Sequence, residues 1–389
     1  MKTIVIGGGA AGMTAAITAA ENKNQVTVIE HQNQIGRKIN ITGNGHCNIS
    51  NLSLDSSKYY GDKDFIHSVL ERINTDKIIS FFEDKGLMLF DKNGYLYPLG
   101  MQATTVTDFL RETALNNNVK IKTNNEIKSI KHVKDKYVID IGIELECDKL
   151  IVATGGKSFA NTGSDGSGYN IAKNFGHKLS LLKPALTALV LEKCSLNKAS
   201  GVRIQGKVSN DSNSYTGELQ ITDYGISGIP VFNLSRTVEE NSYITIDFMP
   251  GYTKKDLKIS LINIFNNFKN QRVTNSLHYM FNEKIALFLT KECNLEKVKC
   301  KDITDIQFEE LLNIIKNYKV KVLKTRGFDY AQVTAGGVDV TEIDKNTMES
   351  KIHKNLYFAG EILDVDGICG GYNLHFAWAT GILAGGCKG

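Results

Sequence analysis

A glycine-rich segment near the start of the chain constrains the fold more than any other feature. Thr3–Ile6 is a short apolar run rich in β-branched residues, which is typical of a buried parallel strand. Gly7–Gly12 follows at once, and the Ala-rich run Met13–Glu21 favours a helix. Gln25–Ile29 is a second apolar run, and Glu30 stands at its end. The pattern is G-x-G-x-x-G inside a β-α-β unit.

Each glycine of this pattern has a physical role in binding a dinucleotide. Gly7 allows a tight turn, Gly9 lets a pyrophosphate approach the backbone because it has no Cβ, and Gly12 lets the helix pack closely on the strand. The amides and dipole at the helix start attract phosphate. Glu30 is expected to accept hydrogen bonds from a ribose. The alternative is a glycine-rich turn in an ordinary α/β protein, but strand, helix, second strand and acid are all in place, so we predict a dinucleotide site.

The composition limits the partners and the compartment. The 389 residues suffice for two or three domains, and the hydrophobic and charged fractions are those of a soluble globular protein. A net charge of +4 is too small to predict a nucleic-acid or membrane partner, so we expect a small-molecule substrate. The seven cysteines show no C-x-x-C spacing, so no metal site is predicted. The chain begins with a strand rather than a signal peptide, and it has no apolar run of ~20 residues, so we expect a cytoplasmic protein.

Two later segments have the same character as the first. Asp148–Gly156 reads as a buried strand that ends in small residues, which lets the backbone pass close to a cofactor. Leu356–Glu361 is a strand that ends in an acid, and Gly370–Leu374 opens an Ala-rich helix whose N-terminus can stabilise negative charge on a flavin. Glu361 is expected to bind a sugar or ribitol hydroxyl. Because cofactor-like turns stand at both ends of the chain, the long FAD molecule fits better than NAD.

Between these segments the pattern changes to alternating strands and then to amphipathic helices. We therefore predict an α/β fold in which a Rossmann-like FAD-binding domain, residues 1–184 and 331–389, is interrupted by an inserted substrate domain, residues 185–330. Residues 185–252 and 319–330 are expected to form a β-barrel, and residues 253–318 a helical subdomain. Because pockets favour domain interfaces, we expect the substrate between the two domains, with Gly225–Gly228 and Thr334–Gly337 as candidates for its wall.

Further cofactor contacts are expected from two charged or polar segments. Arg37 and Lys38 precede a Gly/Asn/Thr-rich loop and could balance the charge of the pyrophosphate or of a reduced flavin; the alternative is a surface pair. Glu126 and Ile127 stand in a β-rich excursion that we expect to bring backbone groups near an adenine.

Several segments spread along the chain match the pattern of a known family. They are Gly7–Gly12, Gly36–Lys38 with Gly45–Asn48, Ala153–Gly156, Gly225–Pro230, Val333–Val338, Thr347–Lys351 and Tyr357–Gly381. On these residues the chain resembles, essentially end to end, bacterial FAD flavoproteins of the aminoacetone-oxidase or bile-acid-reductase-like type. The resemblance implies a glutathione-reductase-like FAD domain with a β-barrel and helical insertion. His46, Asp223-Tyr224 and His375 depart from the family pattern, which bears on the substrate and not on FAD binding.

The predicted cofactor-binding residues follow from these segments. They are Gly7, Gly9, Ala10, Ala11, Gly12, Glu30, His31, Arg37, Lys38, Thr42, Gly43, Cys47, Asn48, Glu126, Ile127, Ala153, Thr154, Gly155, Gly156, Gly360, Glu361, Gly371, Tyr372, Asn373 and Leu374. No acid–base pair is obvious, and the nearest catalytic candidates are His375 and Tyr372. A disulfide relay through Cys47 is not expected, because no second cysteine lies four residues away.

Three functions are compatible with these residues. The first, which we prefer, is an FAD-dependent oxidoreductase that takes hydride from NAD(P)H and reduces a conjugated C=C bond. The second is an amine oxidase of the aminoacetone type that uses O2, and the third is a flavin-binding module without catalysis. No second G-x-G-x-x-G follows a strand, so NAD(P)H would bind transiently in an open flavin cleft as a co-substrate. The oligomeric state is left open.

Overall fold

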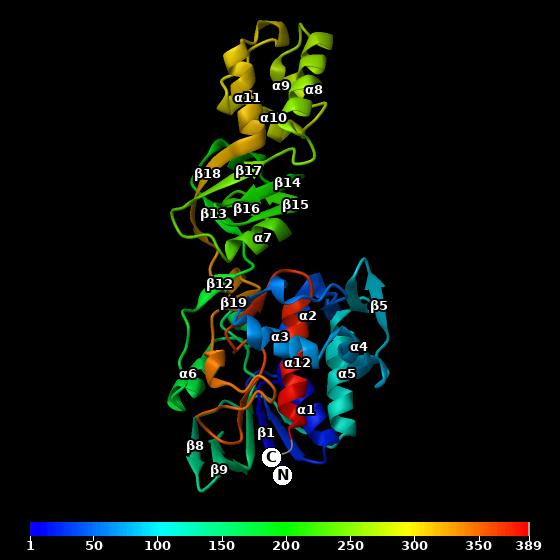
Figure 1. Ribbon diagram of the computed structural model, residues 1–389, viewed down its shortest axis with the longest axis vertical. Coiled ribbons are helices and arrows are strands. Elements are labelled where there is room, and N and C mark those ends of the chain that lie inside the picture. Colours follow the sequence, from blue (N-terminus) through cyan, green and yellow to red (C-terminus); the bar gives the residue numbers. More distant parts are fainter. Residues whose placement is uncertain (388–389) are drawn as a thin grey trace. The chain divides into compact units, whose positions relative to one another are not determined.

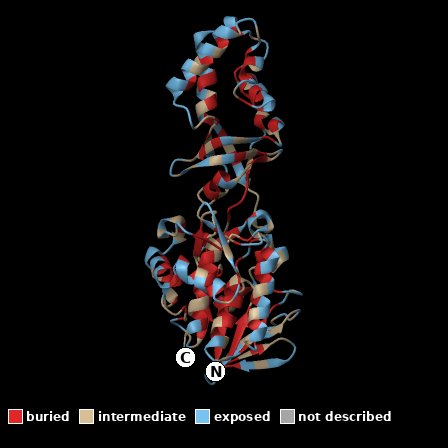
Figure 2. Ribbon diagram, turned by 90° about the vertical axis from the view of Figure 1, so that its right-hand side faces the viewer, coloured by how far each residue is buried: buried red, intermediate tan, exposed pale blue. Residues whose placement is uncertain are grey.

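The chain folds into two units, which we describe from a computed structural model of residues 1–387. The first unit combines Met1–Pro184 with Gln332–Gly389, and the second is Ala185–Ala331. The predicted breaks were at 184/185 and 330/331, so the second break differs by one residue. Buried residues lie inside each unit (Figure 2), and each unit has its own cluster of buried apolar residues.

A five-stranded parallel sheet forms the centre of the first unit (Figure 1). Its strands, in spatial order, are β20 (Leu356–Phe358), β11 (Lys149–Val152), β1 (Lys2–Ile6), β2 (Gln25–Ile29) and β7 (Lys120–Lys122). The inner strands read as continuous apolar runs because helices and loops cover both faces of the sheet, which is the rule for parallel sheets. The strand from the end of the chain therefore lies beside strands from its first half.

The remaining elements of the first unit surround this sheet. The helices are α1 (Ala10–Glu21), α2 (Arg37–Ile41), α3 (Lys63–Arg72), α4 (Thr75–Glu83), α5 (Ala103–Asn116), α6 (Ser167–Asn174) and α12 (Tyr372–Gly386). The strands are β3 (Ser50–Asn51), β4 (Tyr59–Gly61), β5 (Leu89–Lys92), β6 (Tyr95–Pro98), β8 (Ser129–Val133), β9 (Lys136–Asp140), β10 (Glu144–Cys147), β19 (Val333–Ala335) and β21 (Val365–Gly367), with β12 (Lys183–Ala185) at the boundary.

Helices α1 and α12 pack against each other through small residues (Figure 1). A Cβ added to Gly381 would lie 2.2 Å from Thr14 Oγ1, and one added to Gly385 would lie 2.4 Å from the carbonyl oxygen of Ala15. Such close backbone approach is available only to glycine. It places the middle of α12 beside the start of α1, which follows the glycine turn after β1.

The second unit is built on a closed antiparallel barrel, as predicted. Its strands, in spatial order, are β13 (Leu189–Leu191), β16 (Gly225–Ser227), β15 (Ser214–Ile221), β14 (Arg203–Ser209), β17 (Tyr243–Asp247) and β18 (Tyr318–Thr325). Its helices are α7 (Ile229–Ser235), α8 (Lys254–Asn267), α9 (Val273–Leu277), α10 (Glu283–Glu292) and α11 (Asp305–Asn317). The last four stand between β17 and β18 in the chain, and their apolar faces join the barrel in one buried cluster.

The glycines of the β16 region have a role inside the barrel. A Cβ on Gly225 would lie 2.3 Å from the carbonyl oxygen of Leu189, and one on Gly228 would lie 2.4 Å from that of Glu218. Ile226 between them is fully buried in the barrel core. Close strand packing therefore accounts for these glycines, and their proposed role in a pocket wall is not needed to explain them.

A helix that crosses a bilayer needs about 20 predominantly apolar residues. No helix within residues 1–387 is both long enough and apolar enough to do so.

Candidate dinucleotide site

The carboxyl ends of the central strands open into a cavity of about 630 Å³, which lies within the first unit. Its size falls in the range of small-molecule and cofactor pockets. The wall combines residues from both ends of the chain: the turn after β1, the end of β2, the turn after β11, the end of β20 and the first turns of α12. A parallel sheet places all of these strand ends at one edge, which is where ligands bind in such folds.

The turn from β1 into α1 has the geometry of a phosphate cradle. Gly7 has φ of +100°, and a Cβ there would lie 2.4 Å from the carbonyl oxygen of Ala153. A Cβ on Gly12 would lie 1.9 Å from the carbonyl oxygen of Gly7, so this glycine is required for packing. A Cβ on Gly9, by contrast, would meet no atom within 4 Å, and no side chain caps the helix that starts there. The first amides of α1 are thus open to an anion in the cavity.

Glu30 lies at the end of β2 and is 8% exposed. One carboxylate oxygen accepts a hydrogen bond of 2.7 Å from the Gly8 amide, and the other accepts one of 2.8 Å from the Gln32 amide. His31 Nδ1 lies 3.3 Å from the same carboxylate. Two backbone donors therefore fix the carboxylate in place, and each oxygen keeps a lone pair for a hydroxyl of a ligand. Glu30 and His31 both line the cavity.

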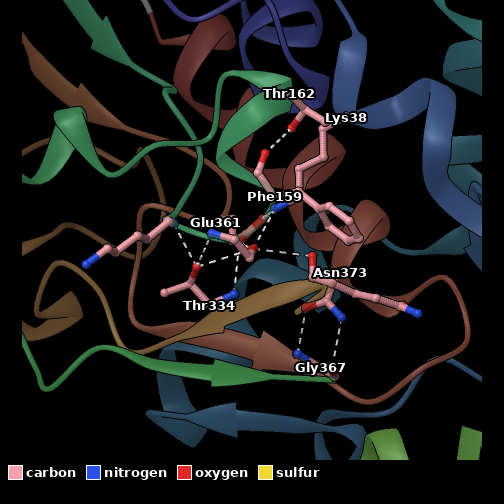
Figure 3. Close-up of polar contacts among 10 residues, drawn as sticks. Lys38, Phe159, Thr162, Thr334, Glu361, Gly367 and Asn373 are labelled. Carbon is pink, nitrogen blue, oxygen red and sulfur yellow. Dashed lines mark hydrogen bonds and ion pairs between the residues drawn. The ribbon is translucent and has the colours of Figure 1, made fainter. Parts of the chain in front are cut away.

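Glu361 follows β20 and is held in a different way (Figure 3). Its carboxylate forms an ion pair of 2.7 Å with Lys38 Nζ and accepts hydrogen bonds from Ser158 Oγ at 2.8 Å and the Thr334 amide at 2.9 Å. Thr334 Oγ1 in turn accepts hydrogen bonds from the amides of residues 157 and 158. We call Lys38, Ser158, Thr334 and Glu361 the Glu361 cluster. Because the cluster occupies most of the acceptor capacity, Glu361 retains little for the ribitol hydroxyl expected from the sequence.

The two adjacent cations after β2 are both engaged by the protein. Lys38 is paired with Glu361, and Arg37 donates to Gln32 Oε1 at 2.6 Å and to the carbonyl oxygen of Asn161 at 2.9 Å. Both line the cavity and were predicted as cofactor contacts. The guanidinium has five donors, so Arg37 can still bind an anionic group, whereas the charge of Lys38 is balanced within the wall.

Two buried hydroxyls of the wall lack a partner within residues 1–387. They belong to Thr154, in the turn after β11, and to Ser164, in the loop before α6. Buried polar atoms in proteins are nearly always hydrogen-bonded, so an unpaired hydroxyl at a cavity points to a ligand. Together with the open amides of α1 and the fixed carboxylate of Glu30, these groups fit a dinucleotide.

The start of α12 forms another part of the wall. Gly371, with φ of +89°, precedes the helix, and the Asn373 side chain exchanges two hydrogen bonds of 2.8 Å with the backbone of Gly367 (Figure 3). Asn373, Leu374 and Ala377 line the cavity. The paired amide fixes the loop that precedes the helix, so the wall is formed in advance of ligand binding.

Most of the residues predicted to bind the cofactor line this cavity. They are Gly7, Gly9, Ala10, Ala11, Glu30, His31, Arg37, Lys38, Thr42, Glu126, Ile127, Ala153, Thr154, Gly155, Gly360, Glu361, Asn373 and Leu374.

The other predicted contacts do not line the cavity. They are Gly12, Gly43, Cys47, Asn48, Gly156, Gly371 and Tyr372. The glycines at 12, 156 and 371 permit close packing: a Cβ on Gly156 would lie 2.5 Å from Thr334 Oγ1, and one on Gly371 would lie 2.8 Å from the carbonyl oxygen of Ser50. These glycines support the wall from behind.

The two catalytic candidates prove to be parts of the protein interior. His375 is fully buried; its Nε2 donates to the carbonyl oxygen of Ile73 at 2.9 Å, and its Nδ1 lies 2.8 Å from Ser50 Oγ. Burial lowers the pKa of His375 to about 4, so the ring is neutral at physiological pH. Tyr372 packs edge-on against Tyr59, and burial raises the pKa of its phenol. Neither side chain lines the cavity, so their positions do not support a role in catalysis.

Sequence reasoning missed one side of the cavity. The wall also contains Lys128 with the start of β8 (Ser129 and Ile130), Gly163–Asp165 before α6, and Asn170, Ile171 and Asn174 of α6. The only signal available was the glycine-rich segment Gly163–Gly168 before α6, which is equally typical of a plain loop. Asn170, Ile171 and Asn174 share one face of α6 by helical spacing, but only the folded structure shows that this face borders the cavity.

The cysteines do not form a redox pair at this site. Cys47 is fully buried, and burial raises the pKa of its thiol to about 12. None of the seven cysteines, all of which lie within residues 1–387, forms a disulfide bond. In the part of the chain that the structure describes, no group of three His, Cys, Asp or Glu side chains could hold a metal ion.

The chain is similar over nearly its whole length to a known family and to characterised proteins. The family described as HI0933-like protein Rossmann domain matches residues 1–387. The chain is 38% identical to a 3-dehydro-bile acid delta(4,6)-reductase of Clostridium scindens, over 98% of this chain and 97% of that protein. It is also 29% identical to the ribosomal RNA dihydrouridine synthase of Escherichia coli, over 97% of this chain and 95% of that protein.

Solved structures give the same fold at lower sequence similarity. The 3-ketosteroid-delta4-(5alpha)-dehydrogenase from Rhodococcus jostii RHA1, in complex with 4-androstene-3,17-dione, is similar with a TM-score of 0.53 and 15% identity. The similarity covers 99% of this chain and 95% of that chain. The architecture is a Rossmann-type FAD-binding fold interrupted by a closed β-barrel.

Proposed function

We propose that this chain, which belongs to the HI0933-like protein Rossmann-domain family and is an FAD-dependent oxidoreductase, reduces a carbon–carbon double bond conjugated to a carbonyl group. NAD(P)H is the proposed electron donor, and a small organic molecule the proposed acceptor. The observation that carries the proposal is the end-to-end similarity to a protein named as a delta(4,6)-reductase of 3-dehydro-bile acids. The substrate of that protein contains the kind of conjugated bond that the proposal requires.

The residues of the cavity wall provide the groups that would hold FAD. The open amides beside Gly9 would bind the pyrophosphate, and Glu30 would accept hydrogen bonds from the ribose. The unpaired hydroxyls of Thr154 and Ser164 would gain partners on binding. When bound, FAD supplies hydride transfer between the nicotinamide donor and the conjugated bond.

The chain's own contribution to the reaction is position and charge. The Glu361 cluster holds an ammonium group and a carboxylate at the wall as a neutral pair, so neither charge faces the cavity uncompensated. Lys38 uses one donor on Glu361 and one on Ser158, so a third N–H is left for a ligand. The N-terminal amides of α12 would stabilise negative charge that develops near them.

A second candidate acceptor is a uridine in RNA, because a full-length relative is named a ribosomal RNA dihydrouridine synthase. The C5=C6 bond of uracil is conjugated to a carbonyl group, so its reduction is the same chemical step on a different substrate. Amine oxidation with O2 differs from both candidates because the amine itself reduces the flavin, and in flavin binding without catalysis no donor reduces it.

The test is anaerobic mixing of the purified yellow protein with NADPH, NADH or aminoacetone, followed by the flavin absorbance. We expect prompt bleaching by a nicotinamide donor, and reoxidation when a steroid 4,6-dien-3-one is added. Reoxidation by uridine-containing RNA alone would favour the second candidate. Bleaching by the amine alone would contradict the proposal in favour of an oxidase, and bleaching by none of these donors would favour a binding module. Release of FMN instead of FAD on denaturation would contradict the cofactor assignment.

A further inference from the structure

The excess positive charge of the chain belongs to the second unit. Ala185–Ala331 contains 20 Lys and Arg residues against 16 Asp and Glu, whereas the first unit contains 26 of each. The total net charge, from which we expected no nucleic-acid partner, therefore conceals an uneven distribution. The positions of the cations in the second unit can therefore indicate where an anionic partner would bind.

Five of these cations lie on two antiparallel segments that flank helices α9 and α10. Arg272 pairs with Lys299 in an antiparallel bridge, and the Lys301 amide donates to the carbonyl oxygen of Lys269 at 3.0 Å. Lys297 precedes them on the second segment. All five are exposed, and none forms an ion pair with another described residue. We call these five residues the basic surface.

An aromatic pair stands next to the basic surface. The rings of Phe268 and Tyr279 have centroids 4.6 Å apart at an interplanar angle of 34°, and Tyr279 is 55% exposed. The Tyr279 hydroxyl donates to Gln271 Oε1 at 3.4 Å, and Gln271 directly precedes Arg272. A large ring is therefore held at the protein surface, supported on one side, in the immediate neighbourhood of unpaired cations.

The basic surface differs from other lysines of the same unit. Lys254 and Lys258 on α8 both form ion pairs with Glu309. Glu296 and Asp302 are exposed next to the basic surface in sequence, but neither forms an ion pair with it. Cations left unpaired are available to an external anion without first breaking a contact within the protein.

We propose that the basic surface and Tyr279 form a binding site for single-stranded nucleic acid. Lysine and arginine side chains along two neighbouring segments match a chain of phosphates, and an exposed ring offers a face on which a base can stack. Cationic contacts to the backbone combined with aromatic stacking are the features of sequence-tolerant binding to single strands. The site shares no residue with the cavity of the first unit and does not depend on the proposed reaction.

The proposal is tested with the full-length, FAD-loaded protein and fluorescein-labelled single-stranded RNA and DNA of 20 nucleotides. Fluorescence anisotropy at several salt concentrations gives the affinity and its salt dependence. For the double variant R272Q/K299Q we expect weaker binding and a salt slope, log K against log salt, that is less steep by roughly 1.4, since each lost phosphate contact contributes about 0.7 for single strands. For Y279A we expect about tenfold weaker binding with an unchanged slope.

The matched control is K254Q/K258Q, which removes the same charge from the same unit but from ion-paired lysines. We expect its affinity to stay within about twofold of the unmodified protein, because both of these cations already have the Glu309 carboxylate as a partner within the protein. Equal weakening by the control would overturn the proposal, since it would reduce binding to a general effect of net charge. Failure to bind either strand at low salt, or preferential binding to phosphatidylserine vesicles, would overturn it as well.

Reduction of a steroid dienone should be unchanged in all variants, so this proposal and the proposed function fail independently.

Discussion

Two acids at the ends of strands line the same cavity, but they are held in place in opposite ways. Glu30 follows β2, and its carboxylate is fixed by the amides of Gly8 and Gln32, which belong to the same β-α-β unit. Glu361 follows β20, and its carboxylate is fixed by Lys38, Ser158 and Thr334, which come from three distant parts of the chain. The sequence signature is similar at both positions: Glu30 directly follows β2, and Glu361 follows β20 after Ala359 and Gly360.

The difference separates what a local pattern specifies from what only the assembled fold specifies. The Glu30 region is contained within about 30 residues, so its spacing alone predicts its geometry. The Glu361 cluster forms only when four segments of the chain come together, so no local spacing in the sequence predicts it. We expect substitutions in the first region to affect mainly the cofactor, and substitutions in the second to affect mainly stability.

Replacement of Glu361 by Ala should have the largest effect on stability. It would leave a partly buried ammonium on Lys38 and two polar groups without an acceptor, a cost of about 3 kcal/mol after allowance for their partial exposure. Urea denaturation of the FAD-free protein measures the free energy of unfolding. The double variant K38M/E361L should recover part of the loss, because the two residues act as a pair. Additive losses in the double variant would contradict this account of the cluster.

The stability of the first unit should also decrease as the pH decreases, because of His375. Its partners, Ser50 and Ile73, are distant from it in the sequence. Its pKa is about 4 in the folded protein and about 6.5 in the unfolded chain, so the unfolded state binds the proton more readily. The stability that the neutral ring confers is therefore complete above pH 6.5 and is lost as the pH falls towards 4, by roughly 3 kcal/mol. Denaturation curves from about pH 7 to about pH 4 measure the loss. The variant H375Q, which does not titrate, should show a smaller loss, and equal pH dependence would contradict the assignment.

Replacement of Glu30 by Ala should weaken FAD retention with a smaller effect on stability. A buried hydrogen bond to a charged group contributes about 1.5–3 kcal/mol, so we expect the dissociation constant of FAD to rise by a factor of about 10 to 150. Flavin fluorescence during dilution or dialysis measures the release. An unchanged dissociation constant would show that Glu30 only closes the turn through the Gly8 and Gln32 amides.

The glycines at positions 9 and 12 sharpen the comparison within the first region. Gly9 has φ of −84° and open space where a Cβ would stand, so G9A should fold with a stability within ~0.5 kcal/mol but bind FAD less tightly. A Cβ on Gly12 would collide with the Gly7 carbonyl oxygen, so G12A should lose about 1–3 kcal/mol of stability. Thermal unfolding and flavin content measure the two effects. Equal effects of both substitutions on stability would contradict the view that Gly9 serves phosphate binding whereas Gly12 serves helix packing.

The sequence predicted the fold well where the pattern was local. The strands β1 and β2, the glycine turn and Glu30 follow from spacing alone, and the alternating segments after Pro184 predicted the barrel. The sequence from residue 63 to residue 85 has helical periodicity throughout but forms two helices, because Asn74 caps the second by accepting a hydrogen bond from the Lys77 amide. The cap residue was visible in the sequence, but the periodicity continued across it.

The sequence predicted less of the site where distant segments meet. Arg37 and Lys38 were expected to balance the charge of the pyrophosphate or of a reduced flavin, and both line the cavity, but each also has partners within the protein whose positions depend on the fold. His375 follows the glycines of α12 and was a natural catalytic candidate, but the helix turns it towards the carbonyl of Ile73 and away from the cavity. Which face of a helix meets the ligand depends on packing that the sequence spacing does not record.

The smallest effect is expected at Cys47, which lies in a loop that the sequence placed against the flavin. A relay of electrons through a disulfide needs an accessible thiolate and a second thiol that can pair with it. Cys47 is fully buried, burial raises the pKa of its thiol to about 12, and it is a free cysteine. The variants C47S and C47A should therefore keep the rate of flavin reduction within about twofold, measured by stopped-flow absorbance at equal FAD content. C47A controls for the hydroxyl that serine would bury. Near-complete loss of turnover in both variants, with FAD still bound, would mean that Cys47 takes part in electron transfer.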